Sequence, residues 1–211
     1  MKKVAIIDYE MGNLASIFQG IRKIGGEPII TNNYDEIIEC KYCILPGVGA
    51  FKKAINKIKE LSLGKAIADF VETGKPLLGI CLGMQLLVDY SEEFGFSKGL
   101  GIIPGHVEKI PDTSGLNVPH IGWNNIFKPD GSGNYWKHKL FREVPENSEF
   151  YFLHSFAVKV KNKANELSLT EYGNYTFCSA IFNRNIVGCQ FHPEKSGPLG
   201  LAIMKDFISL S

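Results

Sequence analysis

The chain has 211 residues, about the length of one large domain and enough to bury a hydrophobic core without disulfides or structural metals. Its composition, 45% hydrophobic and 21% charged, excludes a disordered, collagen-like or low-complexity protein. The 23 basic and 22 acidic residues leave a net charge of +1, so overall charge favours neither nucleic acid nor an anionic membrane as a partner. The longest nearly apolar run, residues 76–88, contains Gln85 and falls short of the roughly 18 residues that span a bilayer.

The cysteines indicate a reducing compartment. There are five of them, an odd number that is typical of free thiols in a cytoplasmic protein. Cys40 and Cys43 have CxxC spacing, but no second such pair completes a zinc site, so we expect both to lie on strands. The sequence therefore predicts a cytoplasmic protein with no bound metal.

Short apolar runs alternate with amphipathic segments over the first ninety residues. From 14 to 24 the apolar residues recur at helical spacing, with Asn13 as the N-cap and Gly25-Gly26 at the end. We expect strands at 4–7, 29–30, 42–45 and 77–80, and helices at 14–24, 51–61, 67–71 and 85–88. This alternation predicts a parallel sheet that is covered on both faces.

The second half of the chain is richer in strands. We expect strands at 150–153, 156–160, 175–182 and 186–191, followed by a C-terminal helix that carries Leu201, Met204 and Ile208 on one side. Asn183-Arg184-Asn185 predicts a hairpin turn, and the polar segment 128–139 predicts a surface loop. The whole chain, 1–211, is therefore predicted to be a single α/β domain with a mixed, mostly parallel central sheet and helices on both faces.

The most informative segment is Gly79-Ile80-Cys81-Leu82-Gly83. It has the G-x-nucleophile-x-G form of a nucleophile elbow, with cysteine as the nucleophile, between an apolar strand and a helix. A thiol at a helix N-terminus lies near unpaired N–H groups, which favour the thiolate. An ordinary strand–turn–helix with a buried cysteine would give the same pattern.

A nucleophilic cysteine needs a base, and His192 is the strongest candidate. It stands in Phe191-His192-Pro193-Glu194, where Glu194 follows two residues later and could project to the same side of an extended backbone. Glu194 would then orient the imidazole while its other nitrogen faces Cys81, as in a Cys-His-Glu triad. The other histidines have weaker claims: His106 and His138 lie in polar surroundings, and His120 and His154 are compatible with core or interface positions.

A third element follows the strand at 42–45. In Pro46-Gly47-Val48-Gly49, two glycines allow backbone N–H groups to turn toward a developing oxyanion, together with the N–H of Leu82. Taken alone, this segment is also compatible with an ordinary loop. A phosphate-binding loop is a weaker interpretation, because no Lys-Ser/Thr follows the glycines.

Together these motifs resemble the class I (triad) glutamine amidotransferases, and in particular the glutaminase subunits of imidazole glycerol phosphate synthases. Several segments carry the resemblance in the same order along nearly the whole chain: Asp8-Tyr9-x-Met11-Gly12-Asn13, Pro46-Gly47-Val48-Gly49, Gly79 to Gln85, His120-Ile121-Gly122-Trp123-Asn124, Tyr151-Phe152-Leu153-His154-Ser155 and Phe191 to Ser196. The resemblance implies the flavodoxin-like fold of that family.

The resemblance also implies a role for each matching residue. Cys81 would be the nucleophile, His192 the base and Glu194 its orienter; Val48, Gly49 and Leu82 would form the oxyanion hole; Gln85, His154 and Ser155 would bind glutamine; Trp123 and Lys195 would face a partner. The implied reaction is hydrolysis of L-glutamine to glutamate and ammonia without a metal or organic cofactor. The implied partner is a (β/α)8-barrel synthase subunit that forms a heterodimer and uses the ammonia to make imidazole glycerol phosphate and aminoimidazole carboxamide ribotide, in histidine biosynthesis.

Three departures from the family pattern leave alternatives open. Glu10 replaces a common glycine, Phe156 replaces a common aromatic hydroxyl, and the loop at 128–139 is long. A paralogous glutaminase that feeds a sugar-amidinating synthase therefore stays open. A glutaminase for pyridoxal phosphate synthesis, a silent binding module and a cysteine peptidase of related fold are further alternatives. The intact set of Cys81, His192 and Glu194 argues against a silent module, and Gln85 and the Trp123 segment argue against a peptidase.

Overall fold

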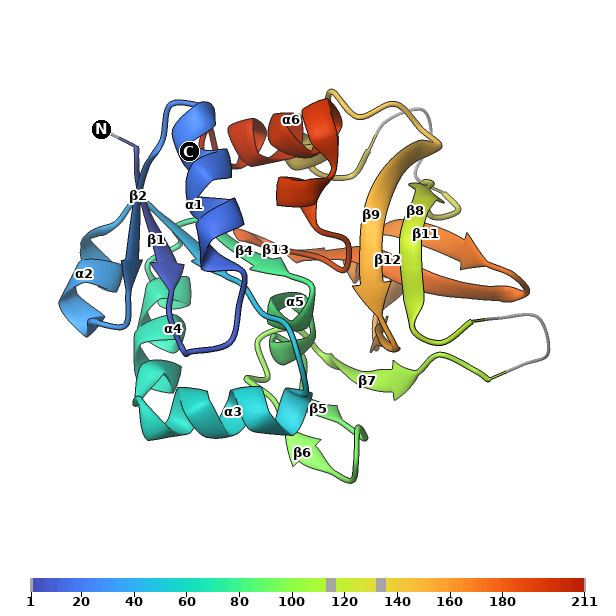
Figure 1. Ribbon diagram of the computed structural model, residues 1–211, viewed down its shortest axis with the longest axis horizontal. Helices are drawn as coiled ribbons and strands as arrows, with labels where there is room; N and C mark the ends of the chain where they lie inside the picture. Colours follow the sequence, from blue (N-terminus) through green and yellow to red (C-terminus); the bar gives the residue numbers. More distant parts are fainter. Residues whose placement is uncertain (1, 113–116, 132–135, 211) are drawn as a thin grey trace.

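The computed structural model describes residues 2–112, 117–131 and 136–210 and contains one large mixed sheet (Figure 1). From one edge to the other its strands are β2 (Glu27–Thr31), β1 (Lys3–Ile7), β3 (Tyr42–Leu45), β4 (Leu77–Ile80), β13 (Ile186–Cys189), β12 (Tyr175–Asn183), β10 (Phe156–Val160), β7 (Gly105–Lys109), β5 (Tyr90–Ser91) and β6 (Ser97–Lys98), and β11 (Glu166–Tyr172) also pairs with β12. The strands from β2 to β13 are parallel to one another. Most pairs beyond β13 are antiparallel, apart from β5 and β7.

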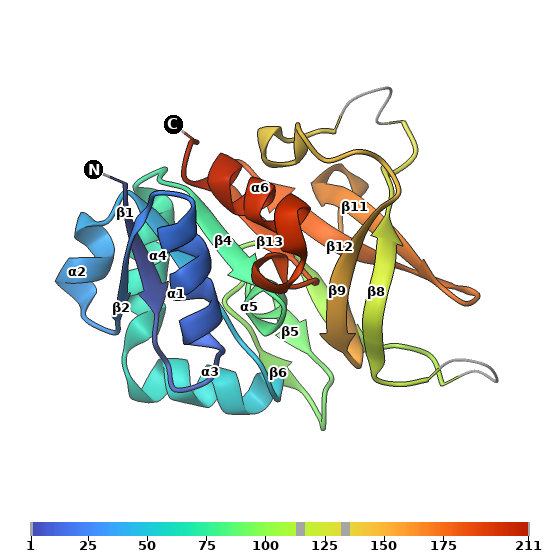
Figure 2. The ribbon, with the colours of Figure 1, turned by 45° about the horizontal axis from the view of Figure 1, so that its top comes forward.

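Helices cover both faces of the parallel part of the sheet (Figures 1 and 2). One face carries α1 (Leu14–Lys23) and α6 (Gly197–Phe207), and the other carries α2 (Tyr34–Glu39), α3 (Phe51–Glu60), α4 (Leu63–Glu72) and α5 (Leu82–Leu86). Short 3-10 turns lie at Lys139–Phe141, Lys163–Asn165 and Pro193–Lys195. The predicted α/β fold with a mixed sheet and helices on both faces is confirmed.

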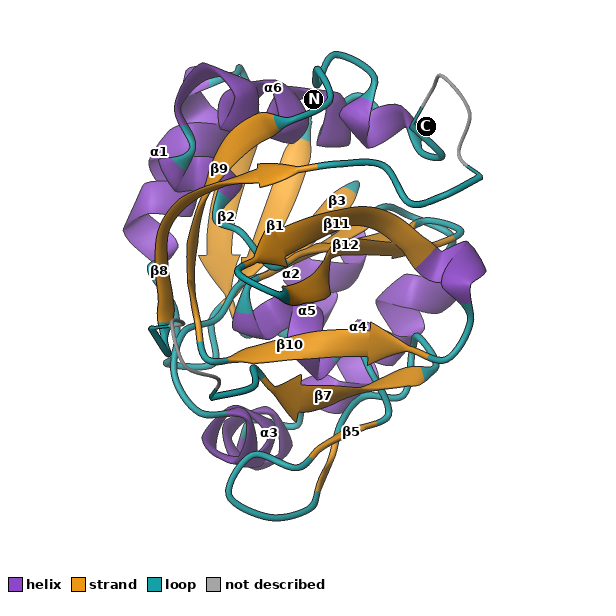
Figure 3. Cartoon of the chain, turned by 90° about the vertical axis from the view of Figure 1, so that its right-hand side faces the viewer, coloured by secondary structure: helices purple, strands orange, loops and turns teal. Residues whose placement is uncertain are grey.

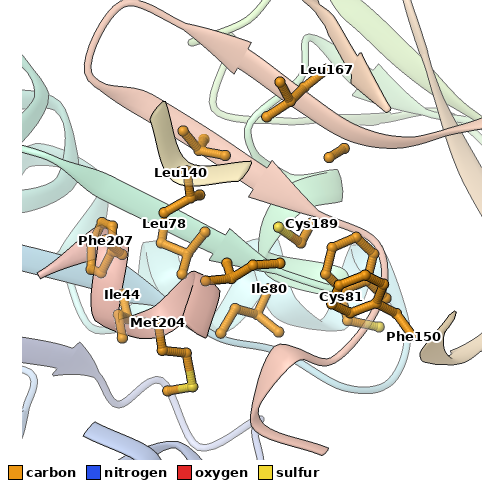
Figure 4. Close-up of a cluster of buried hydrophobic side chains, with 14 of the residues drawn as sticks. Ile44, Leu78, Ile80, Cys81, Leu140, Phe150, Leu167, Cys189, Met204 and Phe207 are labelled. Carbon is orange, nitrogen blue, oxygen red and sulfur yellow. The ribbon is translucent and has the colours of Figure 1, made fainter. Parts of the chain in front are cut away.

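Strand residues alternate between two hydrophobic cores. Ile6 and Ile44 point to the core under α1 and α6, while Ile7 and Leu45 point to the core under α3 and α4. Because successive strand side chains face opposite sides, a strand that is buried on both faces must be apolar throughout. Figure 4 shows part of the first core, in which Ile80, Cys81 and Phe150 lie close together.

A separate two-stranded sheet packs across the antiparallel half (Figure 3). It consists of β8 (His120–Ile126) and β9 (Ser148–His154) in antiparallel register, with Trp123 opposite Tyr151. Its inner face contributes Phe150 and Phe152 to the core beside Phe177 of β12. The end of β9 lies beside Cys81, where β4 ends and α5 begins. The Leu153 carbonyl of β9 is 3.6 Å from the Cys81 sulfur.

The parallel strands all end at the same edge of the sheet. The loops that follow β3, β4 and β13 therefore meet there, as loops do at the carboxyl ends of strands in open α/β sheets. These loops carry the segments 46–50, 81–82 and 190–196, which hold most of the predicted site residues. The topology thus brings together motifs that are more than a hundred residues apart in the sequence.

Most predicted elements lie where the sequence placed them, with specific exceptions. The strands predicted at 42–45 and 77–80 coincide with β3 and β4, and the turn at Asn183-Arg184-Asn185 joins β12 to β13. Cys40, predicted on a strand, instead ends α2, because its backbone N–H bonds to the Glu36 carbonyl of that helix. The helix α2, the strands β5, β6, β7, β8 and β11, and the 3-10 turns were not predicted.

Of the loop predicted at 128–139, residues 132–135 lie outside the described residues. On its far side Trp136 is held by a 2.7 Å hydrogen bond to the Val144 carbonyl. Within the described ranges, no helix combines the length and the apolar character that a membrane crossing requires. The same residues contain no cluster of three or more His, Cys, Asp or Glu side chains placed to hold a metal ion.

Candidate active site

Cys81 occupies a strained turn between β4 and α5. Its backbone has φ 54° and ψ −112°, a combination that residues other than glycine rarely adopt and that is concentrated at functional sites. The flanking glycines are sterically required, since a Cβ on Gly83 would lie 1.8 Å from the Leu45 carbonyl oxygen. A Cβ on Gly79 would lie 2.9 Å from Gly83. This geometry is that of the nucleophile elbow predicted from the sequence.

His192 and Glu194 form a buried pair just after β13. Nδ1 of His192 lies 2.8 Å from Oε1 of Glu194, and the two side chains are 3% and 1% exposed. The reason given for this contact from sequence was wrong in part: Glu194 lies in the 3-10 turn Pro193–Lys195, not on an extended strand. The turn is fixed by Ser196, whose hydroxyl donates to the His192 carbonyl at 2.7 Å and accepts from the Tyr151 N–H at 3.0 Å.

The second ring nitrogen of His192, Nε2, is on the side of Cys81. Nε2 is buried and has no hydrogen-bond partner of ordinary geometry among the described residues. Burial alone lowers the pKa of His192, but the neighbouring Cys81 and Glu194 outweigh it and raise the pKa to about 10. An imidazolium between a carboxylate and a sulfur is the arrangement that holds a cysteine as thiolate and supplies a proton to a leaving group.

The segment Pro46-Gly47-Val48-Gly49 borders Cys81, and its last two residues line the same pocket. Gly47 is packed so closely that a Cβ would lie 2.2 Å from the Tyr9 hydroxyl oxygen, and Tyr9 donates to the Pro46 carbonyl at 2.5 Å. Gly49 has φ 106°, a left-handed conformation that favours glycine. Burial, followed by the charge of Cys81, raises the pKa of Tyr9, so this phenol stays neutral. The loop is therefore held firmly at Gly47, while Val48 is 38% exposed.

A pocket of about 280 Å³ opens beside the cysteine. Seven predicted residues line it, namely Val48, Gly49, Cys81, Leu82, Gln85, His154 and Ser155. Gln85 is oriented by donating Nε2 to the Phe156 carbonyl at 2.9 Å. The ring of His154 is occupied by protein groups, because Nδ1 lies 2.9 Å from the same carbonyl and Nε2 lies 3.1 Å from Nδ1 of His120. A direct contact of the His154 ring with glutamine would require one of these bonds to open.

Five further residues line the pocket but were not assigned to glutamine binding from the sequence: Glu93, Phe94, Pro119, Leu153 and Phe156. Glu93 is the most informative, because it is a buried carboxylate whose Oε2 accepts the Phe51 N–H at 2.6 Å. Burial raises the pKa of Glu93 despite this bond. No motif surrounds Glu93, so only its place in the pocket reveals it.

Trp123 and Lys195 lie outside the pocket, on the outer face of the β8–β9 pair. The Trp123 ring is 6.2 Å from that of Tyr151, and the Lys195 ammonium is 5.7 Å from the same ring. Ile121 and Leu153 extend this face, with 58% and 37% exposure. We call these five residues the outer β8–β9 face. It adjoins the active-site pocket, because Leu153 belongs to both.

Two of the three departures from the family pattern lie in described residues near the site. Glu10, with φ 66°, forms an exposed ion pair with Lys57 at 2.6 Å. Phe156 lines the pocket and meets Phe94 edge to face, with ring centroids 6.5 Å apart. Neither touches the Cys81, His192 and Glu194 triad in the described structure.

Comparison with known proteins defines the family. Residues 5–210 match the glutamine amidotransferase class-I family. The chain is 44% identical over 213 residues to the imidazole glycerol phosphate synthase subunit HisH of Methanosarcina acetivorans, covering 100% of both chains. It is 40% identical over 209 residues to the subunit of the same name from Trichormus variabilis, covering 99% of this chain and 96% of that one.

Solved structures agree on the fold. A chain in the structure of PurLQS from Thermotoga maritima superimposes with a TM-score of 0.70 at 19% identity, covering 99% of each chain. The protein therefore belongs to the class-I glutamine amidotransferases and, within them, to the family of the HisH subunits of imidazole glycerol phosphate synthase.

Proposed function

We propose that residues 1–211 act as one glutaminase unit that hydrolyses L-glutamine to glutamate and ammonia in the cytoplasm. The observation that carries this proposal is the triad, in which Cys81 sits in an elbow and the buried His192–Glu194 pair raises the His192 pKa to about 10. The thiolate of Cys81 attacks the side-chain amide carbon. His192 then protonates the departing ammonia, and the remaining acyl group is held as a thioester.

The second half of the reaction uses the same residues in reverse. Once His192 has given up its proton, Nε2 can accept one from a water that attacks the thioester, and glutamate leaves. Glu194 holds the ring through Nδ1 in both steps. The N–H of Leu82, at the start of α5, and the Val48–Gly49 peptide supply the oxyanion donors in this mechanism.

The lining of the pocket also offers partners for the α-ammonium and α-carboxylate groups of glutamine. The Glu93 carboxylate offers an acceptor for the α-ammonium group, and the Ser155 hydroxyl offers a donor for the α-carboxylate. The Gln85 amide gives its N–H groups to the protein, so its Oε1 remains for the substrate. In this assignment His154 does not contact glutamine directly. Its ring instead holds the backbone at Phe156, which lines the pocket.

The partner in this proposal is a (β/α)8-barrel synthase subunit that forms a heterodimer through the outer β8–β9 face. Ammonia released into water becomes unreactive ammonium, so it is useful only when it passes directly to an acceptor. The outer β8–β9 face suits this role because it is mostly apolar, exposes Ile121, Trp123 and Leu153, and adjoins the pocket. The name of the relatives favours the synthesis of imidazole glycerol phosphate, in histidine biosynthesis, over the sugar-amidinating alternative.

Replacing Cys81 with alanine tests the glutaminase assignment. We expect Cys81→Ala to abolish glutamine-dependent synthesis by the complex while ammonia-dependent synthesis by the partner continues, because only the nucleophile is lost. The matched control is Cys178→Ala, which removes a buried thiol on β12 and should keep the activity. Labelling with an electrophilic glutamine analogue and peptide mapping should modify Cys81. Modification of another cysteine instead would contradict the assignment.

A further inference from the structure

A buried chain of hydrogen bonds joins Gln85 to the nucleophile through Gln190. Gln190 directly follows β13, is completely buried, and donates its backbone N–H to the Ser179 carbonyl at 2.9 Å. Its side-chain Oε1 accepts from Nε2 of Gln85 at 3.0 Å, and its own Nε2 lies 3.7 Å from the Cys81 sulfur. The mechanism above gives this side chain no role.

One backbone carbonyl fixes the orientation of both amides. The Phe156 oxygen can only accept hydrogen bonds, so Gln85 must turn its amide nitrogen toward it, at 2.9 Å. The same nitrogen faces Gln190, which must therefore present its oxygen to Gln85. The amide nitrogen of Gln190 is then the atom that faces the sulfur of Cys81. Turning either amide over would place like groups against each other at a buried site, at a substantial cost in free energy.

We propose that Gln190 is a positioning residue of the glutaminase site, which donates a hydrogen bond to the Cys81 thiolate and holds Gln85 with Oε1 toward the bound substrate. The inference rests on the proposed function, because it assigns Gln190 to the nucleophile and substrate of that reaction. It adds a residue that connects the two ends of the site.

The donor matters because the Leu153 carbonyl beside the sulfur is an acceptor, and the proton that His192 holds toward the sulfur is given up to the leaving group during the reaction. In the thiol form Cys81 can donate to the Leu153 carbonyl at 3.6 Å, but a thiolate has no proton to donate. The Gln190 N–H favours the thiolate instead, since a hydrogen bond to a charged form stabilises that form. The titratable groups whose charges act on the sulfur or its base are Tyr9, His192, His154 and, behind His192, Glu194. All four are unchanged in the variants below.

The first measurement is alkylation of Cys81 by iodoacetamide as a function of pH, followed by mass spectrometry of the peptide that contains Cys81. Gln190→Met keeps the length of the side chain but removes both hydrogen bonds, and we expect it to raise the midpoint by about one pH unit. The control is Ser179→Ala on the neighbouring strand, which removes a buried 2.9 Å hydrogen bond to Ser168 away from the pocket. Its midpoint should match that of the wild type.

The second measurement separates substrate positioning from thiolate stabilisation in the complete complex. Gln190→Met should raise the KM for glutamine about tenfold, because Gln85 loses the partner that orients it. In a Gln85→Met background the same change should raise KM no further, because its effect on KM acts through Gln85. It should still raise the alkylation midpoint there. An additional tenfold rise in KM in that background would overturn the positioning role.

A second variant keeps the inference testable if Gln190→Met does not fold. Gln190→Glu preserves the shape and an acceptor for Gln85 but sets a carboxylate oxygen against the sulfur. We expect a KM close to that of the wild type and a raised alkylation midpoint. If the Gln190 variants that fold share the midpoint of Ser179→Ala, the donor role is overturned. Iodoacetamide needs no glutaminase activity, so this result is separable from a failure of the Cys81→Ala test.

Discussion

The His192–Glu194 turn and the His120–His154 pair are both buried beside β9, but they use histidine in opposite ways. In the pair every ring nitrogen has a partner: Asn124 reaches Nε2 of His120, His120 reaches His154, and His154 donates to the Phe156 carbonyl. The carbonyl can only accept, so the chain of donors fixes the tautomer of each ring. At the turn, by contrast, Nε2 of His192 and Oε2 of Glu194 are buried without partners among the described residues.

The pKa values of the histidines also differ between the two regions. Burial lowers the pKa of His120 to about 4 and that of His154 to about 3, so both rings are neutral at physiological pH. Cys81 and Glu194 overcome burial at His192 and raise its pKa to about 10. A satisfied, neutral histidine stabilises a fold, whereas a charged histidine with one unpaired nitrogen is poised to transfer a proton. We therefore assign the first region to structure and the second to chemistry.

The largest effect that tests this comparison is loss of His192. We expect His192→Ala to lower the glutaminase rate of the complex by about 10⁴- to 10⁶-fold, since residues of a triad act as a unit. Glu194→Gln should cost less, about 10⁴-fold at most, because the ring is still present but less firmly oriented. Steady-state glutamine hydrolysis with the partner subunit present measures both rates.

The control for His192→Ala is a substitution in the His120–His154 pair. His120→Phe preserves the stacking on Phe152 and Tyr172, whose ring centroids lie 4.9 and 4.1 Å away, but removes the ring nitrogens. We expect it to keep the rate within about tenfold of the wild type, because the His120 nitrogens serve the fold. Wild-type activity in His192→Ala would refute the triad. A loss in His120→Phe as large as that in His192→Ala would refute the division between the two regions.

The sequence predicts the chemical region far better than the structural one. Cys81 and His192 stand in short motifs whose geometry is local: a strained elbow after β4, and a 3-10 turn that begins at Pro193 shortly after β13. The His120–His154 contact instead depends on the register of β8 against β9, and β8 was not predicted because its apolar and polar residues do not form a continuous run. Glu93 and Gln190 were not assigned to the site for the same reason, since only tertiary contacts bring them to Gln85 and the pocket.

The secondary structure also divides into elements that the sequence predicts well and elements that it does not. The parallel strands are buried on both faces, so their continuous apolar runs are visible in the sequence, and β3 and β4 were predicted to the residue. The half-buried strands β7 and β11 and the short helix α2 mix polar with apolar residues and were missed. Cys40 was predicted on a strand because it stands just before the apolar residues 42–45, but the strand itself begins only at Tyr42.

A second prediction concerns how the partner controls the chemical region. The outer β8–β9 face lies on the side of β9 opposite His154, and it meets the His192 turn twice: the Tyr151 carbonyl accepts the His192 N–H at 2.9 Å, and Lys195 belongs to the turn. We expect the isolated chain to be a poor glutaminase that the synthase activates about 10²- to 10³-fold when the acceptor is bound. That factor corresponds to one oxyanion donor.

The proposed gate is the Val48–Gly49 peptide, since the adjacent glycines let it rotate and supply or withdraw one N–H group. Hydrolysis should be measured for the chain alone, with the synthase, and with synthase and acceptor. Trp123→Ala should reduce the activation, while Phe96→Ala, which removes another exposed aromatic ring away from this face, should not. Equal rates under the three conditions would eliminate the gate and leave the triad intact.

The smallest predicted effect is on stability, and its sign distinguishes the two regions. Histidine in an unfolded chain titrates near pH 6.5, while the folded pKa values of His120 and His154 are about 4 and 3. Between these values the unfolded state binds more protons, so the free energy of unfolding is fully maintained above about pH 6.5 and falls as the pH is lowered. The slope is at most about 1.4 kcal/mol per pH unit for each histidine. His192 has a folded pKa of about 10, so it binds more protons in the folded state until the unfolded histidine is itself protonated; it therefore opposes this loss down to about pH 5.5 and adds nothing below it.

Urea unfolding between pH 7 and pH 5 measures this slope above the range in which exposed carboxylates titrate. We expect His192→Gln to lose stability somewhat more steeply than the wild type, because the opposing proton uptake by His192 is gone, and His120→Phe to lose it less steeply because one of the two titrating rings is gone. Burial also lowers the pKa of His138, but that residue is present in every variant and cancels in the comparison. A slope that disappears in His192→Gln and persists in His120→Phe would reverse the assignment: the acid-sensitive stability would then belong to the triad, and the hydrogen-bonded pair would not be the structural element of the site.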